Sequence, residues 1–361
     1  MTDRCCGTFS RRDVLGLLGV GGVGSLAGCS DHVHAFLDGC PLADDEVKWC
    51  VQTGAPINSS PAVGTDTVYI WNTASSLYAL TIDDGAERWR FGANEGVLTS
   101  PIIAEGTVYA SAADLHALDA DDGSERWRFD HEGGMTASPT AANGTVYAGS
   151  SEGRIYAVDT DDGSERWHFE TDGMVLSSPA VVDGTVYVGS GDGKLYALDV
   201  DGGSEHWHFQ TDDSIHSSTT VGDGTVYVGG RDQHLYALDS DDGTERWRFQ
   251  TDGPIWSKAT VVDGTVYIGS RDNHVYALDA SDGAEQWRFD AGASIYKSSV
   301  TVTGGTVYAG NSSGNVYAID ARDGTEQWRY EEDRFIDSSP AVVDDTIYVG
   351  IGSRVFALQI P

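Results

Sequence analysis

The stretch GTVYVGSGDGKLYALDVDGGSEHWHFQTD, residues 184–212, is followed by two close copies of itself. Residues 224–252 read GTVYVGGRDQHLYALDSDDGTERWRFQTD, and residues 264–292 read GTVYIGSRDNHVYALDASDGAEQWRFDAG. A sequence that repeats at a fixed period is built from repeated structural units, so the period takes precedence over a domain count based on length.

Tryptophan marks this period along most of the chain. Eight tryptophans are separated by 40, 38, 40, 40, 40, 40 and 41 residues: Trp49, Trp89, Trp127, Trp167, Trp207, Trp247, Trp287 and Trp328. Each unit contains four short runs rich in Val, Tyr and Ile, such as SSPAVV, TVYVGS, KLYALD and EHWHF. Asp and Gly between the runs suit tight hairpins, because both residues tolerate positive φ. Four-stranded units of this length are typical of a β-propeller.

The two ends of the repeat region predict how the ring closes. The last unit stops at RVFALQIP (354–361) without a tryptophan strand, whereas DDEVKWCVQT (44–53) is a tryptophan strand without its three partners. We therefore predict an all-β fold over residues 44–361. It is an eight-bladed β-propeller of four-stranded antiparallel blades, and the N-terminal strand completes the last blade and closes the ring.

The N-terminal residues resemble an export signal. Arg11 and Arg12 precede an apolar run that is too short to span a bilayer, and the run ends in LAGC at Cys29. We predict a twin-arginine signal with a lipobox over residues 1–28, lipidation of Cys29 and a tether over residues 29–43. The expected location is the extracellular face of the cell membrane.

Two further cysteines, Cys40 and Cys50, remain after such processing. In an oxidising compartment they form either a disulfide bridge, which would tie the tether to the first strand, or two free thiols.

The charge balance is strongly negative. Lys and Arg total 22 against 56 Asp and Glu, a formal net charge of -34, and only four lysines occur. Such a field repels nucleic acid and anionic membranes, so we expect neither as a partner and expect membrane contact through the lipid alone. Dense carboxylates with few lysines indicate adaptation to high salt, where screening suppresses self-repulsion. We expect a halophilic monomer.

The repeat pattern LYALDxxDGxExWRF resembles the pyrroloquinoline-quinone-type (PQQ-like) propeller repeat, whose blades dock through a tryptophan near the outer strand. The size, the lipid anchor and the eight blades also resemble the BamB-like lipoproteins of the bacterial outer-membrane barrel-assembly machine. Together with the charge balance, this resemblance implies a haloarchaeal member with a scaffold role.

Three units depart from the others where the chain enters the innermost strand. The uniform units read INSSP, VLTSP, MTASP, VLSSP and IDSSP, and the altered ones read IHSST (215–219), IWSKA (255–259) and IYKSS (295–299). The turns RDQH (231–234) and RDNH (271–274) fall on the same face of the ring. We predict a binding site at one mouth of the channel, formed by His216, Arg231, Trp256, Lys258, Arg271, Tyr296 and Lys297. The alternative is random drift of the repeat.

Two classes of function remain. The first is a binding or scaffold module for a protein or an anionic small ligand, without catalytic, cofactor-binding or metal-binding residues. The alternative is a PQQ-dependent quinoprotein dehydrogenase, in which the resemblance implies that PQQ and calcium lie at the mouth. Against it, the only adjacent cysteines, Cys5 and Cys6, fall in the signal, and Asp337 is the only carboxylate at the inner-strand entries.

Overall fold

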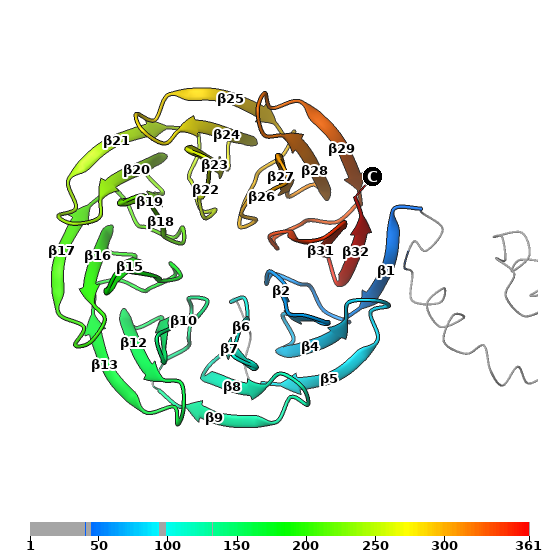
Figure 1. The fold of residues 1–361 in the computed structure, drawn as a ribbon, viewed down its shortest axis with the longest axis horizontal. Helices are drawn as coiled ribbons and strands as arrows, with labels where there is room; N and C mark the ends of the chain where they lie inside the picture. The colour runs from blue at the N-terminus through cyan, green and yellow to red at the C-terminus, as the bar shows by residue number, and fades with distance from the viewer. Residues whose placement is uncertain (1–39, 41–44, 94–98, 132, 361) are drawn as a thin grey trace, which may run out of the picture.

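The structure, a computed structural model, describes residues 40, 45–93, 99–131 and 133–360. These residues form strands β1 to β32, arranged in eight four-stranded antiparallel sheets around a ring (Figure 1). The predicted eight-bladed, all-β propeller is thereby confirmed. No helix capable of crossing a membrane occurs in the described part of the chain. The predicted signal (1–28), Cys29 and all of the tether except Cys40 lie outside the described residues.

The blades follow one another along the chain, and each is numbered here from its innermost strand outward. Blade 1 contains β2 (Ala62–Val63), β3 (Thr67–Trp71), β4 (Ser76–Thr81) and β5 (Glu87–Gly92). Blade 2 contains β6 (Ile102–Ala104), β7 (Thr107–Ser111), β8 (Leu115–Asp119) and β9 (Glu125–Phe129). Blade 3 contains β10 (Thr140–Ala142), β11 (Thr145–Gly149), β12 (Arg154–Asp159) and β13 (Glu165–Glu170). Blade 4 contains β14 (Ala180–Val182), β15 (Thr185–Gly189), β16 (Lys194–Asp199) and β17 (Glu205–Gln210).

The second half of the ring repeats this arrangement. Blade 5 contains β18 (Thr220–Gly222), β19 (Thr225–Gly229), β20 (His234–Asp239) and β21 (Glu245–Gln250). Blade 6 contains β22 (Thr260–Val262), β23 (Thr265–Gly269), β24 (His274–Asp279) and β25 (Glu285–Asp290). Blade 7 contains β26 (Thr301–Thr303), β27 (Thr306–Gly310), β28 (Asn315–Asp320) and β29 (Glu326–Glu331). Blade 8 contains β30 (Ala341–Val343), β31 (Thr346–Ile351), β32 (Arg354–Gln359) and, on its outer edge, β1 (Val47–Gln52).

Burial differs between the strands of a blade in the way their sequences require. The second and third strands, such as β19 and β20, are buried on both faces over four or five residues, because a blade lies on either side of them. Their sequences are accordingly near-continuous apolar runs. The outermost strand alternates instead: in β21, Trp247 is buried while Arg246 and Arg248 are exposed. The core is therefore a set of eight apolar layers between neighbouring blades.

Seven of the eight repeated tryptophans dock on a backbone carbonyl and a glycine of the next blade, and Trp328 instead donates to the Glu46 carboxylate beside β1. The indole of Trp167 in blade 3 donates a hydrogen bond from Nε1 to the carbonyl of Val200 in blade 4, at 2.8 Å. Gly203 of blade 4 lies against the same ring, and a Cβ at this position would come within 2.5 Å of it. Gly203 also has a φ of +68°, which disfavours any other residue. The Trp and Gly columns of the repeat are thus the two halves of one contact.

Blade 8 closes the ring between the two ends of the described chain. β1 pairs antiparallel with β32, with Cys50 opposite Phe356. Trp49 of β1 is buried and donates from Nε1 to the carbonyl of Ile82 in blade 1 at 2.7 Å. A disulfide between Cys40 and Cys50, with Cα atoms 5.8 Å apart, fastens the tether to this strand. Of the two alternatives for these cysteines, the structure forms the bridge.

Candidate functional site

One face of the ring carries two kinds of loop, and we call it the entry face. The first kind leads into the innermost strand of each blade, and the second kind is the turn between its second and third strands. The two kinds hydrogen-bond to each other: the amide of Arg231 donates to the carbonyl of Ser214 at 3.1 Å, and that of Ile255 donates to Gly230 at 3.1 Å. Side chains from neighbouring blades are therefore held at fixed positions relative to one another on this face.

A belt of serine side chains runs around the channel at the start of the innermost strands. At six of the eight steps between described blades, the backbone amide of one blade donates to the serine hydroxyl of the next blade. The bonds join Ser60 to Ser100 (2.8 Å), Ser100 to Ser138 (2.8 Å), Ser178 to Ser218 (3.3 Å), Lys258 to Ser299 (3.0 Å), Ser299 to Ser339 (2.8 Å) and Ser339 to Ser60 (2.9 Å). Lys258 occupies the belt position of blade 6, and because an ammonium group accepts no hydrogen bond, it offers nothing to the amide of Ser218.

The belt corrects the alignment of the blade 7 segment. In an alignment of the sequences without gaps, IYKSS matches the other units residue for residue, and Lys297 takes the place of a serine. In the structure the belt residue of blade 7 is Ser299, whereas that of blade 6 is Lys258, two residues after Trp256. Lys297 is therefore an extra residue between the mouth position and the belt, and it accounts for the 41-residue spacing between Trp287 and Trp328.

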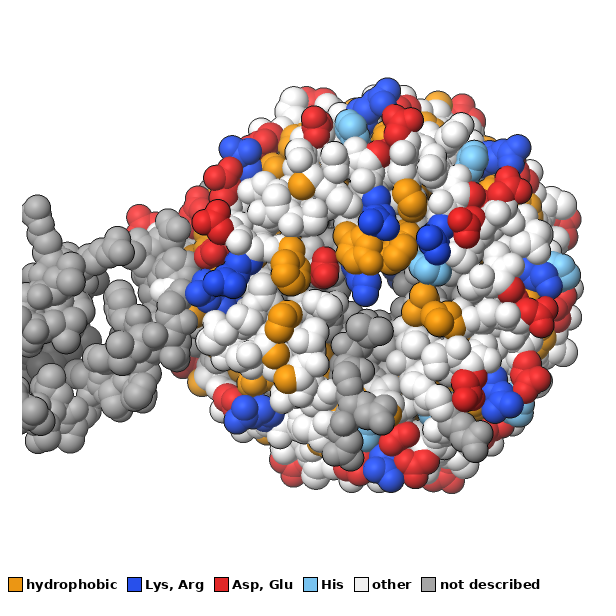
Figure 2. Space-filling view, turned by 180° about the vertical axis from the view of Figure 1, so that it is seen from behind, with side chains coloured by type: hydrophobic (Ala, Val, Ile, Leu, Met, Phe, Trp, Pro, Cys, Tyr) orange, Lys and Arg blue, Asp and Glu red, His pale blue; other side chains and the backbone are white. Residues whose placement is uncertain are grey.

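Two residues before each belt position, or three in blade 7, lies one position per blade at the mouth of the channel, here called the mouth column. Its described members are Asn58, Thr136, Leu176, His216, Trp256, Tyr296 and Asp337. Blades 4 to 7 thus contribute one aliphatic and three aromatic side chains in sequence. Figure 2 shows a group of hydrophobic side chains flanked by basic ones beside the opening at the centre of this face.

Six of the seven predicted site residues form one contact cluster, which we call the aromatic–cationic cluster. The Trp256 ring lies 4.9 Å from that of His216 and 4.8 Å from that of Tyr296, between centroids. The guanidinium of Arg271 lies over both Trp256 (5.1 Å) and Tyr296 (4.8 Å). Arg231 approaches Trp256 at 6.0 Å, and the Lys297 ammonium lies 5.8 Å from the Tyr296 ring. These distances suit cation–π attraction.

Lys258, the seventh predicted residue, is not in contact with this cluster through any described ring or ion pair. It is an exposed residue of the serine belt, yet the protein around it removes enough hydration to lower the pKa of its ammonium group. Its place in the predicted binding site therefore stays a prediction that no contact with the aromatic residues supports.

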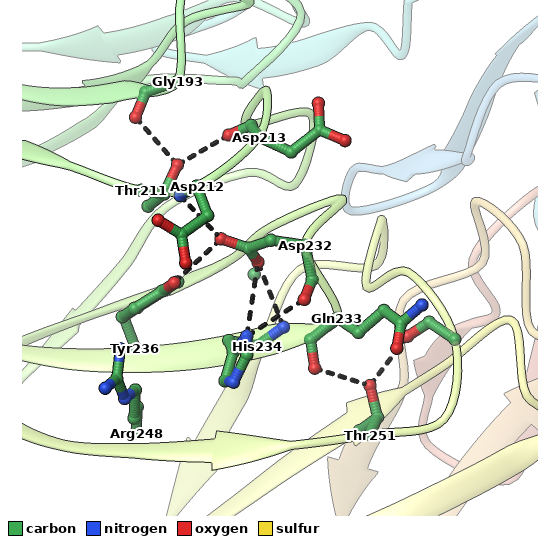
Figure 3. Close-up of polar contacts among 12 residues, drawn as sticks. Gly193, Thr211, Asp212, Asp213, Asp232, Gln233, His234, Tyr236, Arg248 and Thr251 are labelled. Atoms are coloured by element: carbon green, nitrogen blue, oxygen red, sulfur yellow. Dashed lines mark hydrogen bonds and ion pairs between the residues drawn. The ribbon is translucent and has the colours of Figure 1, made fainter.

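Buried aspartates hold the turns that carry the two arginines. Asp232 follows Arg231, and its side chain is only 6% exposed. Its carboxylate accepts hydrogen bonds from the Tyr236 hydroxyl at 2.8 Å and from the Asp212 amide at 3.0 Å, as Figure 3 shows. Gln233 completes the turn with a φ of 71°. With the turn anchored by Asp232, Arg231 is left to extend over Trp256; Asp272 does the same for Arg271 through Tyr276 at 2.8 Å.

The electrostatics of the mouth favour a neutral histidine and oppose a free carboxylate. Burial lowers the pKa of His216, and the positive charges of Arg231 and Lys297 act in the same direction while Asp213 opposes them. Burial also raises the pKa of Asp337 above its usual range, although Lys297 counteracts this. The Nε1 of Trp256 and Nδ1 of His216 are buried without a hydrogen-bond partner.

Sequence reasoning missed a second feature of the entry face, between blades 7, 8 and 1. A depression of about 470 Å³ is lined there by Pro56, Ser313, Arg334, Phe335 and Ser353, among others. Phe335 is 44% exposed. The sequence does contain a sign of this feature. The loop that leads into the innermost strand of blade 8 reads EDRFID, with an arginine and a phenylalanine, whereas the same loops of blades 4 to 6 read TDGMVL, TDDSIH and TDGPIW.

The mouth residues do not fit calcium with a bound quinone, the cofactor set of the alternative enzyme hypothesis. Calcium takes six to eight oxygen ligands, mostly from carboxylates and carbonyls. In the described chain no group of three His, Cys, Asp or Glu side chains is placed to hold a metal. Asp337, the one carboxylate of the described mouth column, interacts with Lys297 instead. We therefore derive no reaction step at this mouth.

The fold and its repeats place the protein among eight-bladed propellers of PQQ-type blades, with a candidate binding site on the entry face. More specifically, the chain belongs to the family described as outer membrane protein assembly factor BamB, whose model matches residues 38–116, 111–221 and 212–360. No curated protein matches the sequence.

Solved structures share the fold at low identity. BamB from Moraxella catarrhalis is 19% identical over 86% of this chain and 98% of its own, with a TM-score of 0.74. The computationally designed Ika8 protein is 14% identical over 88% of this chain and 100% of its own, with a TM-score of 0.78. The quinohemoprotein alcohol dehydrogenase of Comamonas testosteroni is 15% identical over 87% of this chain and 76% of its own, with a TM-score of 0.74. These likenesses concern the fold.

Proposed function

We propose that the protein is a cell-surface binding module that presents its entry face to a partner. Export through the twin-arginine signal and lipidation of Cys29 would hold the ring at the extracellular face of the membrane. In support, the chain belongs to a family described by its part in outer membrane protein assembly, which suits a scaffold role. The negative net charge supports a halophilic setting.

The aromatic–cationic cluster is the observation that carries this proposal. Three adjacent blades depart from the repeat at the same height in the ring, and their side chains meet in one set of contacts. Architecture does not require them: blade 3 has Thr136 in the mouth column, and blade 1 has Asn58, within the same fold. Large aromatic side chains beside guanidinium groups are the usual anchors of protein interfaces.

The test compares partner capture by cluster and control variants at matched folding. Tagged protein is crosslinked on cells at growth salt, purified and quantified with whatever is attached to it. We expect the double variant Trp256→Ser and Tyr296→Ser to keep the wild-type melting temperature and to lose at least tenfold in captured partner, about 1.4 kcal/mol. The matched control, Asn58→Ser with Thr136→Ser, changes the same column in blades 1 and 3.

Equal capture by the cluster and control variants would refute the binding site. The location is checked in the same cells: a Cys29→Ser protein should leave the membrane fraction, and its retention there would refute the lipid anchor.

A further inference from the structure

The charges of the entry face indicate the chemistry of the partner. Resting on the proposed function, we propose that the partner is an acidic polypeptide segment with aromatic or large aliphatic side chains, bound across blades 4 to 8. The proposal depends on three features of the described residues: which basic side chains lack an ion pair, where exposed apolar side chains lie, and how far these features extend.

Basic side chains without an ion pair are concentrated on the entry face. Every arginine that the structure describes, apart from three, forms an ion pair with a carboxylate, mostly on the outer strands. The three exceptions, Arg231, Arg271 and Arg334, belong to loops of the entry face, as do Lys258 and Lys297. Two further described lysines, Lys48 of β1 and Lys194 of β16, also form no ion pair. Among the described arginines, however, all three without an ion pair lie on this face, in a protein whose net charge of -34 makes carboxylates abundant.

The described carboxylates near these cations form no ion pair with them. Asp213 interacts with Arg231, and Asp337 interacts with Lys297, but neither pair is within ion-pair distance. Arg231 and Arg271 are both within 6.0 Å of the Trp256 ring and so bring two like charges together. Carboxylates of a partner would relieve this repulsion and form charge-assisted hydrogen bonds.

Exposed apolar side chains lie on both sides of the cluster. Met174, in the entry loop of blade 4, is 46% exposed, and Phe335, in that of blade 8, is 44% exposed. Between them lie Leu176, Trp256 and Tyr296 of the mouth column. Consecutive blades therefore present an arc of apolar side chains interspersed with unpaired cations. Figure 2 shows hydrophobic and basic side chains near the central opening of this face.

The extent of this arc favours a polypeptide over a small anion. The depression between blades 7, 8 and 1 has the same combination of groups as the cluster, because an aromatic ring, Phe335, and an unpaired arginine, Arg334, both line it. Asp333 lines it as well. A small anion can occupy one of the two places, whereas an extended segment can contact both. At roughly 3.3 Å per residue, an extended twelve-residue segment reaches about 40 Å.

The experiment uses a labelled twelve-residue peptide in which Asp or Glu alternates with Phe or Leu, and binding is followed by fluorescence anisotropy. The full protein is kept at a salt concentration where it is folded. Two control peptides replace the acidic residues by Lys or the apolar residues by Ser. We expect the acidic apolar peptide to bind at least tenfold more tightly than either control.

Matched arginine variants separate the effect of the entry-face arginines on peptide binding from the effect of the overall net charge. Arg271→Ser with Arg334→Ser removes two unpaired cations, and Arg166→Ser with Arg246→Ser removes two paired ones from outer strands, at the same change in net charge. We expect the first pair to weaken peptide binding at least tenfold and the second pair to leave it within twofold.

Three results would overturn the inference. Equal losses in both arginine variants would show that only the net charge matters. Equal binding of the Lys peptide would exclude an acidic partner. Equal binding of polyphosphate would show a site for polyanions in general. If cellular partners are lost in the Trp256 and Tyr296 variant while the acidic peptide still fails to bind, the proposed function stands and this inference fails alone.

Discussion

Lys258 places a positive charge at the channel at a position where serine would make the fold more stable. Its neighbours in the belt are serines whose hydroxyls accept an amide hydrogen bond from the preceding blade, such as Ser339, which accepts from Ser299 at 2.8 Å. Lysine cannot accept this bond, and its own ammonium loses hydration at this position. The residue is thus unfavourable for the ring in two ways, which is typical of positions kept for binding.

We predict that Lys258→Ser stabilises the protein. A serine here can accept the amide hydrogen bond of Ser218, and a net hydrogen bond contributes about 0.5–1.5 kcal/mol. The measurement is the midpoint of thermal unfolding at fixed salt. Ser339→Ala is the reciprocal control, because it removes an existing belt bond and should lower the midpoint by a similar amount. If Lys258→Ser lowers the midpoint instead, the belt does not favour serine.

At the level of strands and blades, most of the fold could be predicted because the same pattern of strand and turn residues recurs in each unit. The tryptophan period gave the blade length, and the missing tryptophan strand after residue 354 gave the closure. The 41-residue spacing shows that blade 7 has an extra residue, but the sequence does not show its position, because Ser298 and Ser299 align equally well with the serines of the other blades. The hydrogen bonds of the belt fix that position. The unpaired state of Arg334 likewise depends on distances in space.

Strand β1 completes the last blade and joins the two ends of the described chain. Trp49 docks on blade 1 through Ile82 and is the one repeated tryptophan whose strand reaches its blade from the opposite end of the chain. We expect Trp49→Ala to cost about 3–5 kcal/mol, as for other buried aromatic truncations. We also expect it to exceed the cost of Trp207→Ala, since loss of β1 exposes the edge of β32.

Thermal unfolding of the two tryptophan variants at equal salt makes the comparison. A Trp49→Ala protein that melts at the wild-type temperature would contradict closure through β1. Cys40→Ser serves as the control for the disulfide alone, whose removal typically costs about 2–4 kcal/mol.

For the whole molecule, charge sets the conditions under which the ring is stable. Most described arginines are already paired, so the excess of carboxylates has no counter-charge within the protein. Their mutual repulsion destabilises the compact state more than it does the unfolded chain. Salt shortens the range of this repulsion, from about 10 Å at 0.1 M to about 3 Å at 1 M.

We therefore predict that the melting temperature rises as KCl is increased from 0.1 M to 2 M. The same series in sucrose, which is excluded from the surface but does not screen charge, separates screening from general solute effects. A melting temperature that is unchanged or falls in KCl would contradict the view that repulsion between carboxylates limits the stability of the folded state.

The extra residue of blade 7 has a consequence for how such a ring can change its specificity. Because belt bonds continue on either side of it, from Lys258 to Ser299 and from Ser299 to Ser339, the mouth column has accepted an insertion without losing the architecture around it. Each blade thus offers an independently variable position on a common frame. Both the side chain and the loop length at this position can therefore change in one blade while the other blades stay the same. A ring of this kind can acquire a new binding specificity at its channel mouth by a change in a single blade.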